Sequence, residues 1–221
     1  MTRWGVASLS VVVVATVLAF CQPWTIRPIG GTGADAASGG GHASGGAFEA
    51  STYVTSVWDA RVLPTAARDA IDLRQALNQT PRDATRRAVL VKGAGIVTSV
   101  DERSRIGLAY VDLVPTDGQP DVALQIGPVL RGTAVRDALG FIRFTDFANQ
   151  IDFARVASEL NARVLASVIA PLGKASSLTG KSVAFTGATT LGGQERASAN
   201  GASAPRVDIT PLVVEIREAA R

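Results

Sequence analysis

The stretch VLVKGAGIVTSV, residues 89–100, decides the fold because it opens a run of three strand-like segments. Its β-branched side chains suit the pleated surface of a strand. Two further segments of this kind follow at residues 106–114 and 121–126. The short connections between them hold charged residues, prolines and the turn-forming pair Asp117-Gly118. These features predict two consecutive hairpins and therefore a three-stranded meander.

The chain after the meander alternates between helical and extended patterns. A short helix is predicted over residues 132–139. A long helix with Thr145 or Asp146 as its cap is predicted to run to about Ile169, because apolar residues recur on one face. The chain then closes with two strands and the Gly/Ser/Ala-rich loop that joins them, at residues 181–186, 207–216 and 187–205.

The chain before the meander has a helical pattern, with apolar residues at three- and four-residue steps. We expect a first helix that contains Trp58 as a core anchor and is punctuated by Pro64. A second short helix is predicted around residues 71–77. A third begins after Thr80, because the following Pro81 suits the first turn of a helix.

The order of three strands, a helical insertion and two strands is that of the OB-fold, a small Greek-key barrel. Gly93 and Gly95 fit the bends that the first strand of such a barrel needs. The predicted fold class is therefore α+β. It consists of a small antiparallel OB-like β-barrel of five strands, a long helix inserted between strands three and four, and an N-terminal helical subdomain. An open α+β sheet with the long helix on one face is the alternative.

The N-terminus indicates where the protein resides. Residues 4–26 carry one charge-free apolar run of membrane-spanning length, and Arg3 precedes it. We expect a transmembrane signal anchor over residues 1–28, with the rest of the chain outside the cytoplasm by the positive-inside rule. The expected location is the inner membrane, single-pass, with the C-terminal domain in the periplasm. Two alternatives remain open. One is a lipoprotein signal acylated at Cys21, although the preceding Phe20 is not the small residue expected there. The other is a cleaved secretory peptide.

The chain is predicted to have four parts. Residues 30–47 read GGTGADAASGGGHASGGA, a composition that behaves as a flexible coil with a reach of roughly 20–25 Å. The parts are an anchor, a Gly/Ser-rich linker, a helical subdomain and an OB-like domain, at residues 1–28, 29–47, 48–88 and 89–217.

Composition excludes several classes of function. The sequence has one Cys and one His, so neither an internal disulfide nor a Cys/His zinc site can be assembled. Because His42 falls in the Gly-rich stretch, a rigid Ser-His-Asp relay cannot be assembled either. The net charge is only +3, both signs are interspersed, and aromatic residues make up 5%. A nucleic-acid surface needs a basic stripe with aromatic residues for stacking. We therefore expect no metal, no cofactor, no catalytic residues and no nucleic acid.

Three motifs suggest chemistry but have simpler interpretations. Residues 92–98 contain two of the three glycines of a dinucleotide fingerprint, yet a strand pattern continues where a helix should start. Asp112, Asp117 and Asp121 surround a turn but are too few for a Ca²⁺ loop. Carboxylates that could form a glycosidase pair are not distinguished from one another by the sequence; they are Asp101, Asp112, Asp137, Asp146, Asp152 and Glu159.

Candidate binding residues fall into two overlapping sets. Amide and guanidinium groups beside aromatic residues are typical of sugar and carboxylate sites, although the same groups could cap helices. The segments 124–138 and 141–154 supply Gln125, Arg131, Arg136, Asn149 and Gln150. An OB-type barrel binds on its second and third strands and nearby loops instead. That surface would hold Arg103, Arg105, Tyr110 and Gln125.

The segments LQIGPVLRGTAVRDA (124–138) and FIRFTDFANQIDFA (141–154) resemble the bacterial family known as domain of unknown function 2291, described as predicted periplasmic lipoproteins. The resemblance covers roughly residues 48–217 and continues in VKGAGIVTSVDERSRIGLAYVD, GKSVAFTGA and ITPLVVEI. It implies an envelope location and, because members are often encoded beside sugar ABC-transporter genes, an accessory role in transport. The family offers no established catalytic residues.

We therefore expect a membrane-anchored extracytoplasmic accessory or binding protein associated with a sugar ABC transporter. Its partners would be the inner membrane and either a transporter component or a small polar ligand such as a sugar. A structural interaction module of an envelope complex, without a small-molecule site, is the alternative. A carboxylate-dependent hydrolase is the third class and the least favoured.

Overall fold

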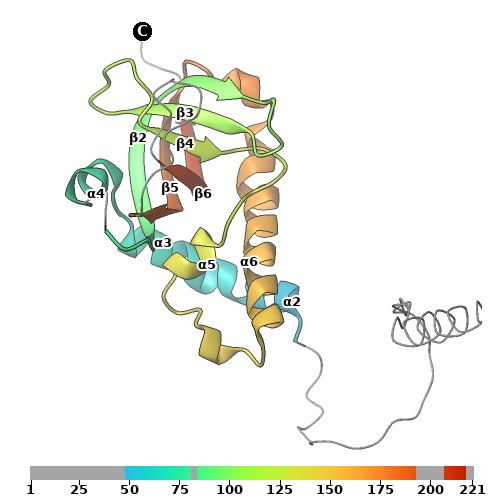
Figure 1. Cartoon of the computed structure of the whole chain (residues 1–221). Helices are drawn as coiled ribbons and strands as arrows, with labels where there is room; N and C mark the ends of the chain where they lie inside the picture. The colour runs from blue at the N-terminus through green and yellow to red at the C-terminus, as the bar shows by residue number, and fades with distance from the viewer. Residues whose placement is uncertain (1–47, 81–83, 193–206, 218–221) are drawn as a thin grey trace, which may run out of the picture. The chain divides into compact units, whose positions relative to one another are not determined.

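The computed structural model describes residues 48–80, 84–192 and 207–217 (Figure 1). The predicted anchor, the linker and the lipidation candidate Cys21 lie outside these residues. Within the described ranges, no helix combines the length and apolar character needed to cross a bilayer.

A six-stranded sheet forms the centre of the described structure, in the order β1-β2-β3-β4-β6-β5. The strands are β1 (Ile71–Asp72), β2 (Arg87–Asp101), β3 (Leu108–Leu113), β4 (Val122–Gln125), β5 (Ser182–Leu191) and β6 (Asp208–Arg217). β2 pairs with β5 through its first part and with β3 through its second part, so β2 to β6 close into a ring. The β4–β6 pair is parallel, and this corrects the expectation of a wholly antiparallel sheet. A two-residue strand, β1, also adds to β2 in parallel where a helix was predicted.

Close packing between strands requires glycine at two positions. A Cβ atom at Gly95 in β2 would lie 2.1 Å from the carbonyl oxygen of Asp112 in β3. A Cβ atom at Gly187 in β5 would lie 2.6 Å from the carbonyl oxygen of Thr210 in β6. Both distances are well inside van der Waals contact, so a side chain would force the strand backbones apart.

The helical segments lie before β2 and between β4 and β5. They are α2 (Ala50–Val57), the π turn η1 (Trp58–Val62), α3 (Leu63–Asp69), α4 (Leu73–Gln79), α5 (Ala134–Ala138), η2 (Phe144–Asp146), α6 (Gln150–Val164), η3 (Leu165–Ile169), η4 (Ala170–Leu172) and η5 (Ala175–Leu178). The start of α2, η2 and the start of α6 lie at the end of the domain opposite β3 and β4 (Figure 1).

Two hydrophobic cores hold these layers together. One lies among the strands and includes Val111, Leu124 and Ile209. The other joins α2, α5 and α6 to the sheet and includes Trp58, whose predicted role as a core residue is confirmed by its burial. Apolar burial of this kind is the main term that stabilises such a domain.

Several predicted boundaries are wrong for local reasons. The first helix does not end at Pro64, because η1 leads directly into α3 and Pro64 falls in the first turn of α3. Proline cannot donate to the helical ladder, and the ladder is locally widened to the π turn η1 just before it. The predicted start of a third helix, at residues 81–83, lies outside the described residues; residues 84–86 after it are not helical, and β2 begins at Arg87. The strand β5 extends to Leu191, because its last residues pair with β2.

The cap of the long helix also differs from the prediction. Thr145 and Asp146 belong to the 3-10 turn η2, and the cap of α6 is Asn149. The Asn149 side chain accepts a hydrogen bond from the backbone N–H of Asp152 at 2.9 Å. An Asn in this position satisfies a backbone donor that the first helical turn leaves free.

Candidate functional site

A polar face forms where residues of β3 and β6 flank the buried Ala123 of β4. Tyr110 of β3 is paired with Ala123 of β4, and Ala123 is paired with Asp208 of β6. Paired residues on neighbouring strands present their side chains to the same face of the sheet, so Tyr110 and Asp208 share a face. Their neighbours Val111 and Ile209 point into the strand core. We call Asp101, Arg103, Tyr110, Arg131 and Asp208 the OB face.

Each carboxylate of the OB face is matched by an arginine. Asp101, the last residue of β2, accepts hydrogen bonds from the backbone N–H and the Nε of Arg103 at 3.0 and 3.2 Å. The backbone hydrogen bond, followed by the side-chain hydrogen bond, holds the pKa of Asp101 below its ordinary value. Asp208 forms an ion pair with Arg131. Arg131 is positioned by its backbone N–H, which donates to Oε1 of the buried Gln125 at 2.7 Å.

Tyr110 lies between these two pairs. Partial burial raises the pKa of Tyr110, the negative charges of Asp101 and Asp208 raise it further, and Arg103 opposes them. The Tyr110 hydroxyl therefore stays neutral and able to donate a hydrogen bond throughout the physiological range. The OB face thus presents a half-buried aromatic ring and two carboxylate–guanidinium pairs, which together supply hydrogen-bond donors and acceptors.

The structure brings together only some of the predicted residues. Arg103, Tyr110, Gln125 and Arg131 belong to the OB face or support it, although Gln125 is only 4% exposed and acts on Arg131 rather than on a ligand. Arg105 is exposed in the connection between β2 and β3.

The other three predicted residues lie in the helical layer. Arg136 of α5 is 9% exposed, its guanidinium stacks on the Phe153 ring at 3.7 Å, and its Nη1 donates to the Phe153 carbonyl at 3.1 Å. It therefore fastens α5 to α6. Asn149 caps α6, and Gln150 is exposed in its first turn. Arg136 and Asn149 therefore have structural partners, whereas Gln150 lines a hollow of about 390 Å³ on α6.

Two carboxylates of the OB face were missed as binding residues. Asp101 was considered only as a hydrolase carboxylate, and Asp208 was not considered. A usable signal existed for Asp208, because it begins the last strand directly after the loop that joins strands four and five, and OB-folds use that loop in binding.

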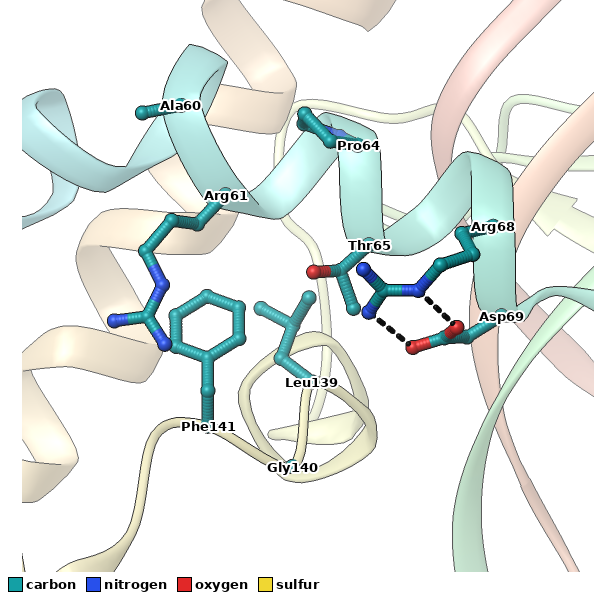
Figure 2. Close-up of a pocket in the computed structure, with 9 residues that line it drawn as sticks. All are labelled: Ala60, Arg61, Pro64, Thr65, Arg68, Asp69, Leu139, Gly140 and Phe141. Carbon is teal, nitrogen blue, oxygen red and sulfur yellow. Dashed lines mark hydrogen bonds and ion pairs between the residues drawn. The ribbon is translucent and has the colours of Figure 1, made fainter.

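Another hollow of the described surface lies away from the OB face. It has a volume of about 490 Å³ and lies between the η1–α3 segment and residues 139–141 (Figure 2). The Arg61 guanidinium stacks on the Phe141 ring at 3.9 Å, and Arg68 is occupied by a two-pronged pair with Asp69 at 2.7 and 2.9 Å (Figure 2). Both arginines of the hollow already have partners, as the two arginines of the OB face do. We favour the OB face because OB-folds bind ligands on their second and third strands and the adjoining loops.

The aspartates that suggested calcium have structural partners. Asp112 accepts hydrogen bonds from the backbone N–H groups of Asp117 and Gly118 at 3.2 and 2.7 Å. Asp121 accepts from Arg74 at 3.0 Å and from the backbone N–H of Leu113 at 2.9 Å. Among the described residues, no group of three or more His, Cys, Asp or Glu residues could hold a metal ion.

Comparison with known proteins identifies the fold and the family. No curated protein matches the chain. A crystal structure described as an OB-fold protein from Thermotoga maritima MSB8 matches with a TM-score of 0.52 and 20% sequence identity, over 78% of this chain and 100% of that chain. At this identity the match shows the fold alone. The chain has a mixed α+β structure, and its structural neighbour is an OB-fold protein. The sequence model of the domain of unknown function 2291 family matches residues 11–215. The chain therefore belongs to this family of predicted periplasmic lipoproteins.

Proposed function

We propose that this protein is a membrane-attached extracytoplasmic binding protein that takes a small carbohydrate on its OB face. The observation that carries the proposal is the position of Tyr110 between two carboxylate–arginine pairs on the OB face. Family membership supports the location outside the cytoplasm and in association with a membrane.

The chemistry of the OB face suits a polyhydroxylated ligand. The C–H side of a sugar ring packs on an aromatic ring, and its hydroxyls pair with carboxylate oxygens and guanidinium N–H groups. The Arg103–Asp101 pair lies at the surface, where solvent screens ion pairs strongly, so a ligand can replace part of its hydrogen bonding at small cost. At about 0.3–0.5 kcal/mol per non-hydrogen atom, a monosaccharide of about 12 such atoms would bind with a Kd between about 40 µM and 2 mM.

The closed pairing of the strands supports an OB-type barrel beneath this face. β2 pairs with both β3 and β5, and β4 pairs with β6, so each of the five long strands has two neighbours. In OB-folds the second and third strands and the adjoining loops bind ligands. Here these strands are β3 and β4, and Tyr110 lies on β3.

The proposal also includes how the protein is attached to the membrane and which protein it serves. The uncharged run of residues 4–26 supports a single-pass anchor in the inner membrane, with acylation of Cys21 as the alternative form of attachment. The natural partner of a carbohydrate-binding accessory protein in this location is a sugar ABC transporter.

Calorimetric titration of the full chain in detergent micelles against a panel of mono- and disaccharides tests the proposal. We expect saturable heat with at least one sugar and about tenfold weaker binding in Tyr110→Ala, since an aromatic contact and a hydrogen bond are lost. Tyr53→Ala is the matched control, because Tyr53 is the other tyrosine and lies in the helical layer. No heat with any sugar, or equal loss in both variants, would reject the carbohydrate site.

The two alternative functions have less support. A hydrolase needs a general acid with a raised pKa. The Asp101 carboxyl has instead a lowered pKa, because of its hydrogen bonds from Arg103.

An interaction module without a ligand site is favoured by exposed apolar residues such as Phe144 and Ile151. It predicts co-purification with a membrane complex after mild detergent extraction.

A further inference from the structure

Five aromatic side chains form a connected cluster where the described chain begins. We call Phe48, Tyr53, Phe144, Phe147 and Phe153 the aromatic tip. Successive ring centroids lie 5.3 to 5.9 Å apart, which is contact distance for edge-to-face and tilted pairs. The tip holds four of the seven phenylalanines of the whole sequence. This concentration is high for a chain with few aromatic residues.

The aromatic tip is not a completed core. None of its five members is fully buried, and Phe144 is 53% exposed. Ile151, in the first turn of α6, is 65% exposed. Phe144 lies in η2 and Ile151 at the start of α6, two segments at the same end of the domain (Figure 1). Large apolar side chains exposed at one end of a domain mark a site of contact with a partner or a membrane.

The charges beside the aromatic tip are nearly balanced. Arg143 and Arg155 are exposed, but each lies within 4.0 Å of a carboxylate, Asp146 and Asp152 respectively. A nucleic-acid or acidic-protein partner would require an excess of positive charge. Aromatic rings and aliphatic side chains flanked by arginines are instead typical of side chains at the boundary between lipid headgroups and acyl chains.

The chain itself indicates which partner covers the aromatic tip. Phe48 belongs to the tip and directly follows the Gly-rich stretch of residues 30–47 in sequence. Any membrane attachment, by residues 1–28 or by Cys21, precedes that stretch in sequence, and a stretch of this composition and length is predicted to span roughly 20–25 Å. A connection of that length would keep the tip at high effective concentration at the bilayer, where even a weak contact is populated.

We propose that the aromatic tip docks on the phospholipid surface to which the protein is attached, with Phe144 and Ile151 entering the headgroup region. The strands β3 and β4 lie at the other end of the domain, so this docking would hold the OB face away from the bilayer (Figure 1). The domain would then have a fixed orientation instead of tumbling freely on its linker.

Photocrosslinking in proteoliposomes tests this docking. The full chain is reconstituted into vesicles of phosphatidylethanolamine and phosphatidylglycerol, with a benzophenone amino acid in place of Phe144. The control carries the same amino acid in place of Gln119, which is exposed in the connection between β3 and β4. Illumination should give at least about fivefold more phospholipid adduct at position 144 than at position 119, because only the tip contacts the interface.

A second experiment separates docking from random collision. With the benzophenone in place of the exposed Arg155, the double substitution F144S and I151S should lower the lipid adduct by about threefold or more, because it removes the inserted side chains. Thermal unfolding of each variant verifies that the domain remains folded. Equal adduct at positions 144 and 119, crosslinks from position 144 to a second copy instead of to lipid, or an unchanged yield in the double variant would overturn the proposal.

Discussion

Gly95→Ala provides the sharpest test of the strand packing that positions the OB face. Gly95 lies in β2 opposite Leu113, and the same β2–β3 ladder pairs Ser99 with Tyr110. An added Cβ atom would meet the Asp112 carbonyl oxygen at 2.1 Å and Cγ1 of Val111 at 2.8 Å. An ordinary contact is above 3.4 Å, so the backbones of β2 and β3 must separate by about 1 Å to admit the methyl group.

The magnitude follows from the two costs of that separation. Overpacking a well-filled site costs about 1–3 kcal/mol. One or two lengthened ladder hydrogen bonds add about 1 kcal/mol each. We therefore expect Gly95→Ala to lower the free energy of unfolding by about 3–4 kcal/mol, which in a domain of this size lowers the Tm by about 10 °C.

Gly118→Ala is the control for this prediction. Gly118 has a φ of +86° in the β3–β4 connection, but nothing lies within 4 Å of its Cβ position. Only backbone strain of about 1–2 kcal/mol is expected there. Thermal unfolding followed by circular dichroism measures both variants. A loss for Gly95→Ala no larger than that for Gly118→Ala would refute the close approach of β2 to β3.

Three further predictions concern charged and titratable groups. Asp208→Asn should lower the pKa of Tyr110 and leave that of Tyr53 unchanged, whereas Asp146→Asn should do the reverse, as followed by near-ultraviolet absorbance of the tyrosines. The pKa values of both tyrosines are raised above 10.0 in the folded state, so the folded state binds more protons than the unfolded state above that pH. The free energy of unfolding should therefore fall as the pH rises above 10.0. Denaturant titrations on either side of that pH would show or exclude this fall. Arg136→Ala should lower the free energy of unfolding by about 2–3 kcal/mol, because it removes a stacked cation and its buried hydrogen bonds, and Arg136→Lys should recover only part of that loss.

The order of the strands was predictable because their local signals are strong. The β-branched run at residues 89–100 and the turn residues after it predict the β2–β3–β4 meander, which the structure contains. Local patterns contain less information about where an element ends. Gly187 to Leu191 have the composition of a loop, and pairing with the first part of β2, joined by β6 at Gly187 and Ala188, makes them a strand.

The candidate site was partly predictable for a related reason. Tyr110 and Arg103 follow from the general use of the second strand and its preceding loop in OB-folds. Asp208 is far from Arg131 in sequence, and the parallel pairing of β4 with β6 brings the two together. The roles of Arg136 and Asn149 depend on which helix each one contacts. Composition shows that such residues could bind a ligand, but only tertiary contacts show that they are already occupied.

Amide chemical-shift mapping of the full chain during titration with a binding sugar tests the central claim most directly. A ligand on the OB face predicts saturable shifts at Tyr110, Ala123 and Asp208, with the amides beside Phe144 unchanged. Asp208→Asn should abolish or shift these changes to higher sugar concentration. The claim is contradicted if no sugar produces saturable shifts, or if the shifts centre on the hollow around Arg61 and Phe141.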